Sequence, residues 1–364
     1  MESRIIFHID FDYFFAQCEE IRTPDLKSKP VCVCVFSDRG GDSGAIATAN
    51  YTARKYGVKS GIPIAFAKKR LEERHDAIFL PVDFDFYSEM SEKAMEIMKN
   101  NADIFEYVGR DEAYLDVTQR VEGSFERASH LAQQIKNSIR DKIKLSCSIG
   151  ISPNKLMSKI ASDFQKPDGL TVVPPDRVET FLESLKIRVI PGIGKKTEAR
   201  FSEMNLETIQ DLKKLDIFTL NKEFGRKNGA YIYNAARGVD NEPVKEREAS
   251  IQYSKITTLK KDSKDYEFLS ENILELCKEV HDIVKKNNRM FRSVGIHFVQ
   301  SDLSNKSKSK MLKNPTESIE ELQKNVTQLL KEALENQTIT IRRLGVKVSE
   351  LSETQGQKDI TSYF

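Results

Sequence analysis

Two acidic clusters, each beside an apolar run typical of a strand, constrain the fold of this chain most strongly. Asp10 and Asp12 follow the first run, and Asp111 and Glu112 stand at the start of the second, far along the sequence. Strands with such residues are normally half buried, and carboxylates at their ends are costly to bury unless something pairs with them. If the two strands lie side by side, Asp10, Asp111 and Glu112 converge.

Converging carboxylates predict a particular chemistry. Hard oxygen ligands of this kind suit Mg²⁺ that is bound together with substrate phosphates. Two such ions about 4 Å apart stabilise the attacking and the leaving oxygen of a phosphoryl displacement. For either cluster taken alone, the simpler interpretation is a solvated turn at a strand end.

Composition limits the other possibilities. A length of 364 residues suggests two to four domains. The net charge of +2 gives no overall argument for nucleic acid, so local basic clusters matter more. The five cysteines show no spacing typical of a zinc site and fit a reduced, cytoplasmic compartment. No signal peptide is expected, and no apolar stretch is long enough to span a bilayer.

The order of expected elements points to an α+β, multidomain chain. Strands and helices alternate up to about residue 172, and short helices with glycine turns follow. The last part of the chain has the order β-α-β-β-α-β, in the segments 251–260, 265–287, 292–300, 308–313, 316–335 and 341–350.

A short helix after Asn50 carries a candidate phosphate site. Asn50 is expected to cap the helix and Gly57 to end it. Tyr51 and Arg54 are three residues apart and share one face, where a phenol and a guanidinium can donate to phosphate oxygens. On these residues alone, an incidental pair on a surface helix is the simpler interpretation.

Two other segments of the chain favour the phosphate site over an incidental pair. The segments D-F-D-Y-F-F-A-Q-C-E-E and R-D-E-A-Y-L-D resemble the first and third motifs of the Y-family DNA polymerases, most closely the archaeal DinB type. The resemblance implies a right-hand polymerase with a helical helix-hairpin-helix thumb and a β-α-β-β-α-β little finger. It places a palm at 1–22 and 82–172, fingers at 23–81, a thumb at 173–240, a little finger at 245–351 and a clamp-binding tail at 352–364.

The resemblance also assigns roles to residues. Asp10, Asp111 and Glu112 would be catalytic and hold two Mg²⁺, with the Phe11 carbonyl as a further ligand. Asp12 and Asp116 would be structural. Contacts with the incoming nucleoside triphosphate would come from Thr48, Tyr51, Arg54 and Lys166.

A bulky ring beneath the sugar leaves no room for a 2′-hydroxyl, and the resemblance makes Phe15 this steric gate. The alternative is that Phe14 and Phe15 are both core residues. Alternation along an extended chain is expected to send one of the two inward and the other toward the site.

DNA contacts are expected in two places. Gly192, Gly194, Lys195 and Lys196 resemble a helix-hairpin-helix, whose backbone N–H groups and helix start approach a phosphate. The segment 225–229 is a looser candidate for a second copy. The last domain carries many basic residues on or beside its strands, and by the resemblance its sheet contacts phosphates. These residues are Lys255, Lys260, Lys261, Lys285, Lys286, Arg289, Arg292, Lys306, Lys308, Lys310, Arg342, Arg343 and Lys347.

The C-terminal segment fits the pattern Q-x-x-I-x-x-Y-F through Gln357, Ile360, Tyr363 and Phe364. This matches the peptide that partners of the PCNA sliding clamp use. One isoleucine and two aromatic rings in a short helical turn can fill an apolar pocket.

One departure from the family pattern concerns the metal site. The family has a serine and an apolar residue before the Asp-Glu pair, whereas this chain has Gly109 and Arg110. Arg110 is expected to point away from Asp111 if both lie on a strand. Turned inward, it would compete with a metal ion.

The sequence thus predicts a DNA-directed DNA polymerase that performs low-fidelity translesion synthesis with two Mg²⁺. Its partners would be primer-template DNA, deoxynucleoside triphosphates and a PCNA-type clamp, with no membrane and with a monomer as the default. A two-metal nuclease would explain the carboxylates but not Tyr51, Arg54, Lys166 and Phe15 together. A clamp-tethered, non-catalytic DNA-binding protein is the other alternative, and the acidic triad argues against it.

Overall fold

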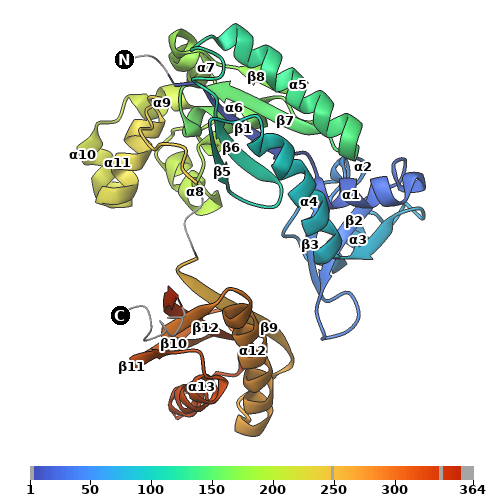
Figure 1. The fold of residues 1–364 in the computed structure, drawn as a ribbon, viewed down its shortest axis with the longest axis vertical. Helices are drawn as coiled ribbons and strands as arrows, with labels where there is room; N and C mark the ends of the chain where they lie inside the picture. The colour runs from blue at the N-terminus through green and yellow to red at the C-terminus, as the bar shows by residue number, and fades with distance from the viewer. Residues whose placement is uncertain (1–3, 247–249, 336–338, 354–364) are drawn as a thin grey trace, which may run out of the picture. The chain divides into compact units, whose positions relative to one another are not determined.

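A computed structural model describes residues 4–246, 250–335 and 339–353. Within these ranges the chain forms two compact units (Figure 1). The first consists of Met1–Val35 and Ala45–Arg247, and the second of Phe36–Gly44 and the chain from Glu248 onward. No helix of the described residues is both long enough and apolar enough to cross a membrane.

A five-stranded sheet organises the first unit, with the order β5-β6-β1-β7-β8. β1 lies at its centre and pairs antiparallel with β6 and with β7, while β7 and β8 are parallel. The strands span Ile6–Phe11 (β1), Ile104–Tyr107 (β5), Glu112–Asp116 (β6), Cys147–Ser152 (β7) and Leu170–Val172 (β8). The two acidic clusters therefore belong to neighbouring strands, as their sequence predicts.

The two faces of this sheet are covered by different helices. Alternate residues of β1, Phe7, Ile9 and Phe11, are buried in one core with apolar residues of α4 (Phe84–Lys99) and α5 (Phe125–Ile143) (Figure 1). The other face carries His8 and Asp10 and packs against α6 (Lys155–Phe164). This second face is the polar one, and it holds the candidate site.

Gly150 on β7 lets α6 approach the polar face closely. A Cβ atom at Gly150 would lie 2.0 Å from the Ser158 carbonyl oxygen and 2.4 Å from the Ser162 backbone nitrogen. Only a residue without a side chain fits there. The close approach brings Lys159 of α6 to Glu112 of β6, and Ser162 of α6 to His8 of β1.

A three-stranded sheet with the order β3-β2-β4 follows α1 (Phe14–Arg22) along the chain. Cys32 and Cys34 of β2 share one small core and the alternate Val31 and Val33 face another, as alternation predicts. The elements are η1 (Pro24–Leu26), β2 (Val31–Phe36), β3 (Gly44–Ala49), α2 (Tyr51–Arg54), α3 (Ile64–Arg70) and β4 (Ile78–Pro81).

Short helices with glycine turns follow β8, as the sequence indicates. They share a core with apolar residues of α6. Gly225, with φ +80°, joins two helices that pack against each other, so the segment 225–229 has the helix-glycine-helix form. The elements are η2 (Pro175–Arg177), α7 (Val178–Glu183), η3 (Ile187–Val189), α8 (Lys195–Glu203), α9 (Ile209–Lys213), α10 (Ile217–Phe224) and α11 (Arg226–Ala235).

The second unit has the predicted order β-α-β-β-α-β. Its sheet has the order β11-β10-β12-β9 and is antiparallel throughout. Apolar residues of both helices and of one sheet face form its core. The elements are β9 (Gln252–Ser263), α12 (Tyr266–Lys286), β10 (Arg289–Gln300), β11 (Asn305–Thr316), α13 (Ile319–Leu334) and β12 (Ile341–Glu353).

Candidate active site

Three carboxylates meet at one end of the β1–β6 pair. Asp10 lies directly opposite Glu112 in the antiparallel register, so both side chains point to the same face. Asp111 precedes β6, and its carbonyl oxygen accepts a hydrogen bond of 2.8 Å from the Phe11 backbone nitrogen. The convergence predicted from the sequence is therefore present in the structure.

Two lysines neutralise part of this acidic group. Lys166 Nζ lies 2.6 Å from Asp10 Oδ1 and 2.8 Å from Asp163 Oδ1. Lys159 of α6 forms a short ion pair with Glu112. Lys166, to which the family resemblance assigns a triphosphate contact, thus pairs with Asp10 in this structure.

Burial and charge move the pKa values of the three acids in different directions. Burial raises the pKa of Asp10 to about 6 although Lys166 opposes the shift. Burial, and then the charge of Glu112, raises the pKa of Asp111. A hydrogen bond from His8 and the pairing with Lys159 lower the pKa of Glu112 to about 2. Added positive charge at this site would therefore stabilise the ionised forms of Asp10 and Asp111.

His8 is a site residue that the sequence reasoning missed. It is fully buried, with Nε2 3.2 Å from Glu112 Oε2 and Nδ1 2.7 Å from Ser162 Oγ. Nε2 also lies 3.3 Å from Lys159 Nζ, so the ring borders both partners of the Lys159–Glu112 ion pair. Burial lowers the pKa of His8 to about 4, so the ring is neutral. Its position two residues before Asp10, on the same strand face, was the signal that could have identified it.

A buried network positions the loop that carries Lys166. Asp12 is 1% exposed and accepts hydrogen bonds from the Ser146 and Ser148 hydroxyls and from the Asp168 backbone nitrogen. The buried Lys136 of α5 donates to the Gly169 and Cys147 carbonyl oxygens. Asp12 is thus structural, as predicted, and Lys136 is a second residue that the sequence reasoning missed.

Asp116 also has a local structural partner. Its carboxylate accepts hydrogen bonds from the backbone nitrogen and the hydroxyl of Thr118, at 3.0 and 2.6 Å. The contact closes the turn after β6, so Asp116 does not join the acidic cluster. This agrees with the structural role predicted for it.

Phe14 and Phe15 behave differently from each other, but not for the predicted reason. Both lie in α1, so strand alternation does not apply and that part of the prediction is wrong. The rotation of about 100° per helical residue separates them instead. Phe14 is buried in the core, whereas Phe15 is half buried and stacks on Tyr87 at 4.5 Å between ring centroids.

The candidate phosphate-binding residues lie on β3 and α2. Asn50 caps α2 as expected, and its side chain accepts from the Ala53 backbone nitrogen at 3.0 Å. The helix ends at Arg54, earlier than predicted, and a turn then leads to Gly57, with φ +78°. The Arg54 guanidinium lies 4.9 Å from the centroid of the Tyr51 ring, which confirms their common face. Thr48 is partly exposed at the end of β3.

Arg110 points away from the acids. Its Nε donates to Ser88 Oγ of α4 at 3.0 Å, and the guanidinium lies 5.3 Å from the centroid of the Phe84 ring. It therefore does not compete for the carboxylates. The direction agrees with the prediction, although Arg110 lies in the turn before β6 and not on a strand.

Comparison with known proteins places the chain in a family. Residues 9–163 match the model of the impB/mucB/samB family and residues 250–361 its C-terminal domain, while 188–240 match the DNA polymerase-iota thumb domain. The chain is 82% identical, over the full length of both proteins, to DNA polymerase IV of Nitrosopumilus maritimus. The chain belongs to the Y family of DNA polymerases, in its DinB type. It is a DNA-directed DNA polymerase.

More distant relatives and solved structures agree with this assignment. DNA polymerase IV of Saccharolobus solfataricus is 37% identical over 95% of this chain and 96% of its own. A Y-family DNA polymerase chimera of Dbh and Dpo4 has a TM-score of 0.89 at 36% identity, covering 96% of this chain and 99% of the chimera. A ternary complex of Dbh DNA polymerase has a TM-score of 0.69 at 36% identity, covering 95% and 98%. The predicted multidomain, α+β Y-family fold is thereby confirmed.

The predicted helix-hairpin-helix of the polymerase has an exposed turn. Gly192 has φ +84°, and Gly194 precedes the first residue of α8 without a side chain to cap it. Lys195 and Lys196 begin α8 and are exposed. A cavity of about 430 Å³ lies behind the turn, where Tyr231 donates to the Pro191 carbonyl oxygen at 2.7 Å.

The polymerase's second unit has one open sheet face, and the register shows which basic residues lie on it. Residues opposite each other in antiparallel strands share a face. Lys306, Lys308 and Lys310 pair with core residues of β10, so they point to the helix side. Arg343 pairs with Val299 and Lys347 with Gly295, which puts them on the open face.

Two other basic residues, Lys255 and Arg342, lie on β9 and β12. Lys255 pairs with Val346 and lies on the helix side, 3.4 Å from Glu279 of α12. Arg342 lies in the register irregularity between Ile341 and Arg343. The basic residues that the sequence grouped together therefore divide between two faces.

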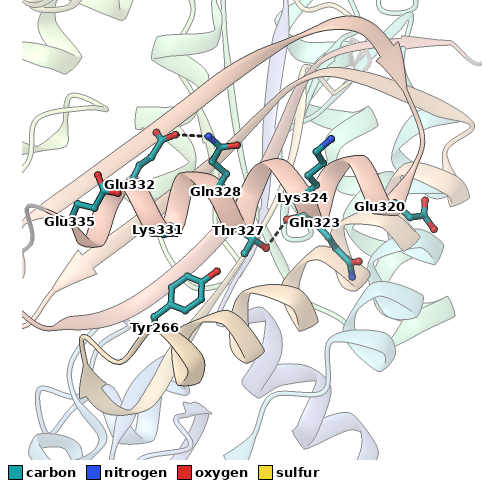
Figure 2. A pocket seen from close by; sticks show the side chains of 9 residues that line it. All are labelled: Tyr266, Glu320, Gln323, Lys324, Thr327, Gln328, Lys331, Glu332 and Glu335. Carbon is teal, nitrogen blue, oxygen red and sulfur yellow. Dashed lines mark hydrogen bonds between the residues drawn. The ribbon is translucent and has the colours of Figure 1, made fainter.

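A cavity of about 850 Å³ follows α13 in the second unit. Figure 2 shows its lining, which comes from α13 and from Tyr266 at the start of α12. Its polar groups are partly used locally, since Gln328 donates to Glu332 at 3.1 Å and Thr327 to the Gln323 carbonyl oxygen at 2.7 Å (Figure 2). The acidic triad belongs to the other unit, so we assign this groove no role in the reaction.

The predicted clamp-binding residues Gln357, Ile360, Tyr363 and Phe364 lie outside the described residues. The boundaries proposed for palm, fingers, thumb and little finger stay a prediction.

Proposed function

We propose that this polymerase performs low-fidelity translesion synthesis by a two-Mg²⁺ nucleotidyl transfer centred on Asp10, Asp111 and Glu112. The observation that carries the proposal is the pairing of Asp10 with Glu112 on adjacent strands, with Asp111 beside them. A nuclease or a non-catalytic tether would also need a DNA-binding chain, but membership of a polymerase family favours synthesis.

The chemistry of the donor set fits a pair of divalent ions. Asp10, Asp111 and Glu112 supply hard carboxylate oxygens, with the Phe11 carbonyl nearby in sequence. Within the described ranges, no group of three such residues is already arranged to hold a metal ion. In this structure Lys166 pairs with Asp10, and Lys159 pairs with Glu112. Bound Mg²⁺ would neutralise charge on the reacting phosphate and activate the 3′-hydroxyl.

The chain's own residues then bind and orient the substrates. Tyr51, Arg54, Lys166 and Thr48 would hold the triphosphate of the incoming nucleotide. Lys166 would leave Asp10 for this role. His8, held by Ser162, would keep the Glu112 carboxylate oriented. Phe15 would close the space beneath the sugar.

A primer-extension assay across an abasic site tests the translesion proposal. With Mg²⁺ and deoxynucleotides, we expect the chain to extend a labelled primer past the lesion, because the region 23–81 contains only a small sheet and short helices to enclose the nascent pair. Copying of an undamaged template with a complete stop at the lesion would contradict the proposal. Shortening of the primer would support a nuclease instead.

DNA binding would use two surfaces, the turn around Gly192, Gly194, Lys195 and Lys196, and the open sheet face with Arg343, adjacent to Arg342 in sequence. Neither surface offers a pattern that reads base sequence. Phosphate contacts of this kind make affinity fall steeply with salt.

His297 predicts a pH dependence of DNA binding. It lies opposite Gly345 on the open face, where a Cβ at Gly345 would lie 2.2 Å from the ring. Burial, and then the charges of Lys347 and Arg343, lower its pKa below the usual 6.5. A bound phosphate favours the protonated ring, so DNA binding would take up a proton and strengthen as the pH falls below about 6.5.

Fluorescence anisotropy with duplex DNA measures this effect. Between pH 8 and pH 6, we expect the DNA affinity of the native chain to increase about threefold more than that of His297→Gln. His281, which is partly exposed on α12 and whose Nε2 lies 3.0 Å from the Glu317 carbonyl oxygen, is the matched control. Equal pH profiles for the native chain and His297→Gln would rule the linkage out.

We also propose that the tail with Gln357, Ile360, Tyr363 and Phe364 binds a PCNA-type clamp, and that the polymerase is a monomer. Removing the two aromatic rings in Tyr363→Ala/Phe364→Ala should weaken clamp binding at least 100-fold, since buried aromatic anchors dominate such contacts. Calorimetry with an archaeal clamp measures it. Unchanged binding would show that another surface is used.

A further inference from the structure

Arg110 is a charged residue for which the reaction as described has no use. It is exposed and directly precedes Asp111. Its Nε bonds to Ser88, but among the described residues it makes no ion pair and its two terminal nitrogens have no hydrogen-bond partner. A guanidinium with two unused donors beside a phosphoryl-transfer site can bind a phosphate.

The turn holds Arg110 in a defined place. The Ser91 hydroxyl of α4 donates to the Arg110 carbonyl oxygen at 2.6 Å, and the guanidinium lies over the Phe84 ring. Phe84 is 45% exposed and contacts Phe15 edge to face at 6.1 Å between centroids. Arg110 thus stands at the end of an aromatic row that begins at the proposed sugar site. It borders a cavity of about 620 Å³ that is open to solvent.

The sheet order shows on which side of the carboxylates Arg110 lies. Asp10 and Glu112 occupy β1 and β6, and the turn with Arg110 joins β6 to the edge strand β5. The loop with Lys166 leads into β8, at the opposite edge beyond β7. Across the sheet the acids therefore lie between the turn of Arg110 and the loop of the proposed triphosphate lysine, while the Arg110 side chain itself packs on α4.

In a phosphoryl transfer the attacking and leaving oxygens lie roughly in line on opposite sides of the phosphorus. If the pyrophosphate leaves on the side of Lys166, the primer strand approaches from the side of β5. We propose that Arg110 binds a backbone phosphate of the primer strand next to its 3′ end and so positions the primer terminus. The inference rests on the proposed location of the triphosphate.

One acidic residue opposes this contact. Glu92 of α4 borders the same cavity, together with Ser88, Tyr107 and Val108. Among the described residues it forms no ion pair with Arg110, so the guanidinium keeps its unused donors. A single exposed carboxylate reduces the local attraction for a phosphate but leaves the specific contact with the terminal nitrogens available.

DNA binding in EDTA, without any nucleotide, tests the proposal separately from catalysis. For Arg110→Gln we expect a Kd for primer-template DNA about 5- to 20-fold higher, and a slope of log affinity against log salt smaller by about 0.9, the value for one phosphate. Arg110→Lys should keep the slope and part of the affinity, because it keeps the charge and loses the fork. Arg120→Gln, the same charge change at the other end of the β5–β6 hairpin, should alter neither quantity.

A neutral phosphate locates the contact. A methylphosphonate at the phosphate nearest the primer 3′ end should weaken DNA binding by the native chain. Arg110→Gln should bind this modified DNA as tightly as it binds unmodified DNA. The same substitution in the template strand should weaken both proteins equally. The proposal is overturned if Arg110→Gln binds DNA like the native chain, or if it changes only the KM for the deoxynucleotide. If the proposed function is wrong instead, the native chain would bind primer-template DNA normally but would not extend the primer.

Discussion

Asp111→Asn and Glu112→Gln are each expected to slow nucleotide addition by about 1000-fold or more, which corresponds to about 4 kcal/mol of transition-state stabilisation. Both substitutions keep the shape of the side chain and remove the charge that a divalent ion requires. Glu112 is the more informative position, because His8 and Lys159 keep its carboxylate ionised and oriented. Single-turnover extension of a labelled primer with Mg²⁺ measures the rate.

Asp116→Asn is the matched control. It removes one carboxylate from the same strand, but within the part of the chain that the structure describes that carboxylate bonds to Thr118 in the turn after β6 alone. We expect its extension rate to stay within a few-fold of the native value. DNA binding should persist in all three variants. Native rates in Asp111→Asn or Glu112→Gln would show that the acidic cluster is not the reaction centre.

Phe15→Ala is expected to raise the incorporation of ribonucleotides relative to deoxynucleotides by about 100-fold, the size of discrimination that a pocket exerts on one hydroxyl group. The ring is held from behind by its stacking on Tyr87, so the space that opens lies on the exposed side. The ratio of kcat/KM for the two nucleotide classes is the quantity to measure. Little change in KM for the deoxynucleotide is expected.

Phe86→Ala serves as the control for loss of an aromatic residue. Phe86 is also partly buried against the same core, but its ring lies under the Arg22 guanidinium, 4.5 Å away, and not in contact with Phe15. It should lose stability without changing sugar selectivity. If Phe15→Ala and Phe86→Ala alter selectivity equally, the effect is a loss of rigidity and not the removal of a gate.

Local signals account for what could be predicted. The common face of Cys32 and Cys34 on β2 is legible from the sequence, because the side-chain period of a strand is two. The cap at Asn50 and the glycine turns act over a few residues and are legible in the same way. The β-α-β-β-α-β order followed from segment lengths and periodicity.

Other features depended on contacts across long distances in sequence. The partnership of His8 with Glu112 and Ser162 needs α6 to lie directly on Gly150. Lys136 acquires its role only when α5 meets the loop at Gly169. The position of His8 on its strand indicates that it shares a face with Asp10, but neither this position nor that of a lone lysine on a helix reveals the partners that the fold brings to them.

The sequence by itself determined the acidic pattern, the order of elements and the family, because these depend on residue identity and spacing along the chain. Only the tertiary structure decided which basic residues share the open sheet face, where Arg110 points, and that lysines occupy two of the three carboxylates. The physical reason is that strand register, helix docking and the desolvation of charge arise between segments that the chain keeps far apart until it folds.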